Sequence, residues 1–183
     1  MEERPLPQTN TTRYYASGYI SKDYDEIILV PLHEEFPEEL YERWPVVVLP
    51  LRTLPVYIGQ AVKAILLESI PGERGKNKTL LKWLTDFPQG NIFVGKSDLE
   101  SISKQTHFGK TYINMSGYQT LKAQTFKDFE KYYLPLRIDA DATEIQVVVV
   151  FNEWHPNQLT QAVPVDIEEN KLGGLILSYL ELF

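Results

Sequence analysis

Cysteine is absent from this 183-residue chain, which removes several kinds of chemistry at once. Without thiols there is no disulfide framework, no thiolate nucleophile and no zinc site built on sulfur. Long apolar runs are also lacking, since the longest, Val147 to Phe151, is far shorter than the roughly 18–20 residues that span a bilayer. The opening Met1 to Pro5 carries acids where a signal peptide has a basic stretch. We therefore expect a cytoplasmic protein that does not bind a membrane.

Basic residues are fewer than acidic ones. The chain has 18 Lys and Arg against 25 Asp and Glu, for a formal net charge of −7. Such a protein repels phosphate backbones, so we expect no nucleic-acid partner. Its 43% hydrophobic and 23% charged residues are typical of a folded domain, and a chain of this length buries roughly 70% of its unfolded surface. We predict a flexible lead-in over residues 1–12 and a single domain over residues 13–183.

Sequence signatures of catalysis are missing too. There is no G-x-S-x-G elbow and no G-x-G-x-x-G fingerprint. Residues 139–143 (D-A-D-A-T) resemble the nucleophile motif of haloacid-dehalogenase phosphatases, in which one aspartate attacks phosphorus. Only Asp166 follows Asp141 as a further aspartate, so the metal-binding part of that motif is missing and a solvated turn is the better interpretation.

Two further chemical readings are also weak. Residues 72–79 (G-E-R-G-K-N-K-T) have two residues between the glycines where a Walker A loop has four, and Asn77 follows the lysine. His33, His107 and His155 share no spacing typical of metal ligands. We therefore predict no metal, no cofactor and no catalytic residue.

The pattern of apolar residues predicts an α+β fold, with a central, mostly antiparallel or mixed sheet, helices packed on it and a helix at the C-terminal end. Strands are predicted at 14–20, 27–30, 46–49, 91–95, 136–138 and 144–151. Helices are predicted at 34–44, 56–69, 79–87, 97–105 and 167–182, and residues 110–134 as a strand followed by a helix. A turn at 23–26 makes the first two strands a hairpin, and Pro31 ends the second. The run 144–151, apolar on both faces, is expected in mid-sheet under helices.

Two of these helices begin alike. Residues 58–62 (I-G-Q-A-V) and 172–176 (L-G-G-L-I) both place a glycine after the first apolar residue. A glycine near the start of a helix allows close packing on a sheet, which explains the similarity without further assumptions. Internal duplication is the alternative.

Acidic residues are concentrated between Ser21 and Glu42. Eight acids stand there against the single base Lys22, a local balance of −7. The acids are Asp23, Asp25, Glu26, Glu34, Glu35, Glu38, Glu39 and Glu42. Aromatic residues between and beside them, above all Tyr41 and Trp44, are typical anchors of protein interfaces, while carboxylates steer a basic partner. These ten residues are our predicted partner-binding site, and an ordinary solvated surface is the alternative.

The chain resembles the immunity proteins of bacterial contact-dependent growth inhibition systems. The resemblance is carried by the strand 144–151, by the ending 165–173 (V-D-I-E-E-N-K-L-G) and by the segment 58–62. It implies a small, acidic, cytoplasmic α+β protein that binds the toxic C-terminal domain of its cognate toxin, often a nuclease, and blocks it. An acidic aromatic surface then occupies the basic cleft in which a nuclease holds phosphate.

A hydrolase is the second hypothesis. Scattered carboxylates, Asp139 and Asp141 among them, would act with a metal or with His155, since side chains that meet in space need no sequence spacing. An assembly scaffold is a third. The immunity hypothesis predicts a protein partner and no catalysis.

Overall fold

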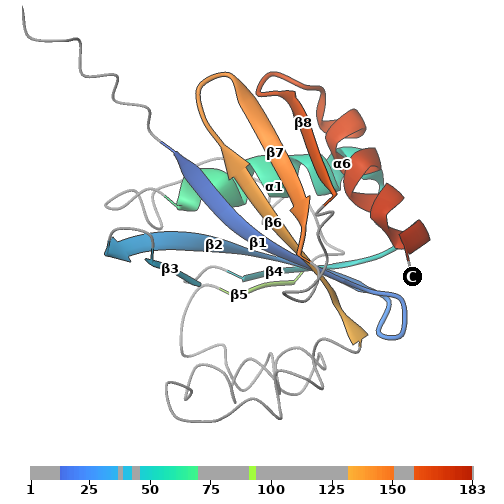
Figure 1. The fold of residues 1–183 in the computed structure, drawn as a ribbon. Helices are drawn as coiled ribbons and strands as arrows, with labels where there is room; N and C mark the ends of the chain where they lie inside the picture. The colour runs from blue at the N-terminus through green and yellow to red at the C-terminus, as the bar shows by residue number, and fades with distance from the viewer. Residues whose placement is uncertain are drawn as a thin grey trace, which may run out of the picture.

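The computed structural model describes residues 13–36, 39–42, 46–69, 91–93, 132–150 and 159–182. These contain eight strands: β1 (Tyr14–Ser21), β2 (Glu26–Phe36), β3 (Glu39–Glu42), β4 (Val46–Pro50), β5 (Asn91–Phe93), β6 (Leu134–Ala140), β7 (Glu144–Val149) and β8 (Thr160–Pro164). They form one sheet in the order β5-β4-β2-β1-β6-β7-β8, with β3 also paired to β2 (Figure 1). Every pairing between them is antiparallel. The predicted α+β fold class is confirmed.

The predicted hairpin forms the centre of the sheet. β1 pairs with β2 from Tyr15↔Leu32 to Ser21↔Glu26, and its other edge pairs with β6 from Tyr14↔Ala140 to Ile20↔Leu134. The far end of β2 and the β6–β7 turn therefore flank the start of β1. The β1–β2 turn lies at the opposite end of the sheet, about 23 Å away at 3.3 Å per strand residue.

The predicted helix over residues 34–44 is wrong, as is the strand end at Pro31. β2 continues through Pro31 to Phe36, and β3 then pairs back on it. Pro31 lies between the part of β2 that pairs with β4 and the part that pairs with β3, so on that edge a residue without an N–H is tolerated. Cross-strand pairing, which local sequence does not reveal, overrides the helix-like run of glutamates.

Two helices cover one face of the sheet. α1 (Pro55–Glu68) and α6 (Glu169–Ser178), continued by the 3₁₀ turn η2 (Tyr179–Leu182), pack against alternate residues of β1, β2, β4, β6 and β7 (Figure 1). Ile58, Ile65 and Leu172 are fully buried there. A second buried cluster, which includes Tyr19 and Tyr133, lies on the other face. Within the described residues, no helix is both long and apolar enough to cross a membrane.

Glycine lets the two helices cross closely. A Cβ on Gly59 of α1 would lie 1.9 Å from the carbonyl oxygen of Glu169, and one on Gly173 of α6 would lie 1.8 Å from that of Pro55. Each glycine therefore faces the start of the other helix, where no larger residue fits. The repeated glycine thus serves helix–helix packing, where the sequence pattern indicated helix–sheet packing.

The C-terminal half shows smaller differences. β7 buries Ile145, Val147 and Val149 on the helix side, whereas its alternate residues are only half-buried, so the expectation of two covered faces is wrong. β8, which the sequence pattern did not indicate, pairs with β7 and lies at the end of the strand order. The helices predicted at 79–87 and 97–105, residues 94–95 and all but the end of 110–134 lie outside the described residues.

Candidate functional site

The predicted acidic segment is divided between the two ends of β2. Asp23 and Asp25 are exposed in the β1–β2 turn, and Asp25, at φ 53°, lies 3.6 Å from Arg52 in an exposed ion pair. Glu34 lies eight residues after Glu26 in β2, which is about 26 Å in an extended strand. The ten predicted residues therefore do not form one patch.

Glu26 differs from the other predicted residues because it is buried, with 7% of its surface exposed. It accepts a hydrogen bond from the hydroxyl of Tyr133, and Tyr24 stacks on the Tyr133 ring with centroids 5.7 Å apart. Burial, followed by the bond to Glu26, raises the pKa of Tyr133 well above its usual value. This carboxylate therefore offers a partner little surface and acts within the fold.

Of the remaining predicted residues, those that the structure describes belong to the other end of β2. The backbone pairs Glu34 with Leu40, His33 with Tyr41 and Leu32 with Glu42. Glu35 lies within β2, and Glu39 opens β3. Glu38 and Trp44 lie outside the described residues. As a binding site, this set remains a prediction.

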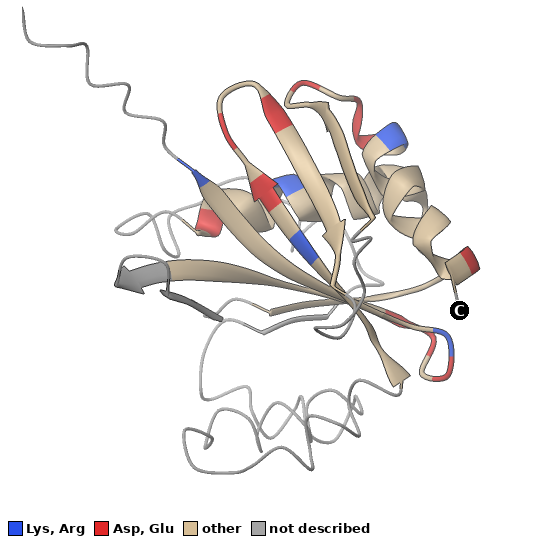
Figure 2. Cartoon of the chain, in the orientation of Figure 1, with Lys and Arg blue, Asp and Glu red and all other residues tan. Residues whose placement is uncertain are grey.

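A second group of acids lies at the same end of the sheet, in and beside the β6–β7 turn (Figure 2). Asp139 of β6 forms an ion pair with Arg137, in which Nε of Arg137 lies 2.9 Å from Oδ1 of Asp139. One oxygen of Asp141 accepts the backbone N–H groups of Thr143 and Glu144 and the hydroxyl of Thr143, at 2.7–3.0 Å. These bonds hold the pKa of Asp141 below its usual value. Both aspartates therefore have structural partners, which agrees with a turn more than with a phosphatase nucleophile.

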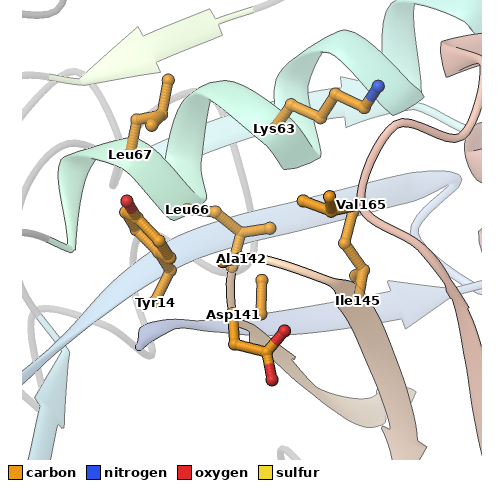
Figure 3. Close-up of a pocket in the computed structure, with 9 residues that line it drawn as sticks. Tyr14, Lys63, Leu66, Leu67, Asp141, Ala142, Ile145 and Val165 are labelled. Atoms are coloured by element: carbon orange, nitrogen blue, oxygen red, sulfur yellow. The ribbon is translucent and has the colours of Figure 1, made fainter. Parts of the chain in front are cut away.

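An apolar cavity of about 300 Å³ lies between α1 and the β6–β7 turn (Figure 3). From α1, Lys63, Leu66 and Leu67 line it, and Tyr14 closes one side. We call this cavity the hollow. It is assembled from segments that are distant in the sequence, and no sequence motif indicated it.

The other wall of the hollow comes from the C-terminal half. Residues 140–142 and Ile145 of the β6–β7 hairpin line it, together with Val165 after β8. A smaller polar depression of about 60 Å³ also involves Ala140 and Asp141, and is further lined by Arg13, Asp139, Glu144 and Gln146. The chain therefore places an apolar hollow and an acid-rich depression beside each other at one hairpin.

Metal chemistry finds no support in the described part of the chain, where no group of three His, Cys, Asp or Glu residues is arranged to hold a metal ion. His33 lies within β2. His107 and His155 lie outside the described residues, so the hydrolase hypothesis through His155 stays a prediction.

Comparison with known proteins gives similarities at the level of the fold. No protein-family model matches the sequence, and no match is found among curated proteins. A protein of unknown function from Neisseria meningitidis is similar in structure, with a TM-score of 0.55 and 13% identity over 96% of this chain and 99% of that one. A chain of the CdiA-CT/CdiI toxin and immunity complex from Yersinia pseudotuberculosis is similar with a TM-score of 0.50 and 15% identity, over 92% and 97% of the two chains.

Proposed function

We propose that this protein is an immunity protein, which binds a cognate contact-dependent growth inhibition toxin in the cytoplasm and blocks it without catalysing a reaction. One observation carries the proposal: the chain shares its fold, over 97% of the neighbour's length, with a chain of a toxin and immunity complex. The resemblance noted in the sequence points in the same direction independently of this comparison.

Charge favours the immunity role over the toxin role within such a pair. A nuclease toxin has to bring a polyanion to its active site, and positive surface potential assists that approach. This chain carries a net charge of −7 and adds acids around the β6–β7 turn to those at the end of β2. Such a surface is suited to cover a basic nucleic-acid cleft and to exclude its substrate.

The direct test is co-purification of the tagged protein with the C-terminal domain encoded immediately upstream. We expect a one-to-one complex with a nanomolar or lower dissociation constant, weaker binding at higher salt, and growth protection when both proteins are co-expressed. The salt dependence follows from the screening of exposed charges, whose Debye length falls from about 10 Å at 0.1 M to about 3 Å at 1 M. No complex and no protection would refute the proposal for this pair.

Charge reversals at the two ends of the sheet show which acids bind. Glu39→Lys changes the β2–β3 end, and Asp23→Lys makes the same change in the exposed β1–β2 turn. We expect slower association and weaker binding for Glu39→Lys, with little change for Asp23→Lys, because the further acids around the β6–β7 turn lie at the β2–β3 end. The reverse result would place the interface at the β1–β2 turn.

A further inference from the structure

The hollow is apolar inside, although two charged residues line it. The Lys63 ammonium points away from it and donates a 2.5 Å hydrogen bond to the carbonyl of Ile167, with Glu169 3.6 Å away (Figure 3). The Asp141 carboxylate turns toward its own loop. Among the described residues that line the hollow, the surface that faces it is therefore mainly carbon.

The rim of the hollow is apolar and accessible. Leu67 and Val165 are 40% and 37% exposed, whereas the floor residues Leu66 and Ile145 are only 4% and 1% exposed. Single exposed apolar residues are common, but here two of them border a cavity. A dry cavity of about 150 Å³ accepts benzene, so a volume of 300 Å³ holds the ring of one aromatic side chain.

The acid-rich depression beside the hollow restricts what else the occupant carries. Asp139, Asp141 and Glu144 line it with one base, Arg13, and it shares Ala140 and Asp141 with the hollow. A ligand segment that fills the hollow and the depression together needs an apolar part and, next to it, a positive charge. An aromatic residue beside a lysine or arginine in a protein segment meets both conditions.

We propose that the hollow receives an aromatic side chain of the toxin domain, with a neighbouring basic side chain of the same segment lying against the acid-rich depression. This inference rests on the proposed immunity function and locates the centre of its interface. Interface hot spots are typically pockets that hold an aromatic or arginine side chain, and a few such anchors carry most of the binding energy.

Two substitutions test the hollow itself in the binding assay. Ala140→Leu adds side-chain atoms that fill the hollow from its wall, and Leu67→Glu places a charge on its rim. We expect each variant to bind the toxin domain at least about 10-fold more weakly, which corresponds to about 1.4 kcal/mol. Leu54→Glu is the matched control, because Leu54 is 60% exposed at the other end of α1, about 20 Å away along the helix.

The charged margin has its own substitution. Glu144→Lys reverses one acid of the depression, and Glu181→Lys reverses an exposed acid on η2. We expect Glu144→Lys alone to weaken binding by about 10-fold and to reduce its salt dependence. Thermal unfolding of every variant verifies that the fold is retained, and Leu67→Glu keeps the test valid if Ala140→Leu does not fold.

The outcomes separate the inference from the function on which it rests. If the unsubstituted protein forms no complex, both proposals fail. If it forms the complex and Leu67→Glu binds as tightly as Leu54→Glu, the immunity function stands and the hollow is not the anchor site. Selective loss in Leu67→Glu and Glu144→Lys, with both controls unchanged, supports the inference.

Discussion

Replacing Gly173 by alanine tests the closest contact in the fold, the crossing of α1 and α6. The added Cβ would lie 1.8 Å from the carbonyl oxygen of Pro55, whereas carbon–oxygen contacts normally begin near 3.3 Å. The helices would have to separate locally by about 1.5 Å. Leu172 and Ile176, both fully buried on the same helix, would lose packing as a result.

The expected change in the free energy of unfolding is the balance of two terms. Overpacking of this kind costs about 1–3 kcal/mol, and the upper end applies because the obstacle is backbone that cannot rotate away. Alanine recovers about 1 kcal/mol through its higher helix propensity. We therefore expect Gly173→Ala to destabilise the protein by about 2 kcal/mol, a fall in Tm of roughly 4–8 °C for a chain of this size.

The neighbouring glycine supplies the control. A Cβ on Gly174 would meet nothing within 4 Å outside its own helix, so Gly174→Ala gains the helix propensity without the clash. We expect it to stabilise the protein by up to about 1 kcal/mol. Urea unfolding followed by circular dichroism measures both variants. If the two alanines shift the midpoint in the same direction by similar amounts, the helices do not cross as closely as we describe.

Three further predictions concern hydrogen bonds inside the fold. Tyr133→Phe should destabilise the protein by about 1–3 kcal/mol by removing the donor to buried Glu26. Because folding raises the pKa of Tyr133, its contribution to stability is full below the unfolded pKa near 10 and is lost as the pH rises above it. The alkaline fall in stability should therefore be shallower in Tyr133→Phe by about 1.4 kcal/mol per pH unit, measured by unfolding across that range. Ser69→Ala removes the acceptor of the Tyr15 N–H at 3.1 Å and should cost about 1–2 kcal/mol in the same assay. Asp141→Ala should lower stability at neutral pH and reduce its loss in acid, because the lowered pKa of this carboxyl makes a contribution that disappears as pH falls through it.

Local sequence patterns predicted the elements whose stability is local in origin. The hairpin of β1 and β2 has a turn between two strand-like runs, and α1 repeats its apolar residues at helical spacing, so both were expected within two residues except at Pro31. The helix prediction for the segment after Pro31 was wrong because the conformation of this segment depends on pairing with β3. This non-local interaction outweighs the helix-like spacing of the glutamates.

The hollow could not be predicted from local sequence patterns, because it too depends on non-local contacts. Its walls come from the start of β1, from α1, from the β6–β7 hairpin and from Val165, and none of these carries a chemical motif. One signal was present in residues 139–142, whose D-A-D-A order alternates acid and alanine where β6 passes into the β6–β7 turn. Ala140 and Asp141 line both features, whereas Ala142 lines only the hollow and Asp139 only the depression, so the two features adjoin at this segment.

Because the acidic segment is divided between the two ends of β2, net charge alone does not locate the partner-binding surface. If charge alone steered the partner, reversals at either end of β2 would slow association about equally, since both ends carry acidic residues. Steering, however, determines mainly the rate of encounter, while the lifetime of a complex depends on buried anchors. In the described part of the chain, the β6–β7 end combines acids with an apolar cavity of about 300 Å³, and Asp23 and Asp25 do not line that cavity. Reversal of Asp23 should therefore alter the association rate at most, whereas closing the hollow at Ala140 should shorten the lifetime of the complex.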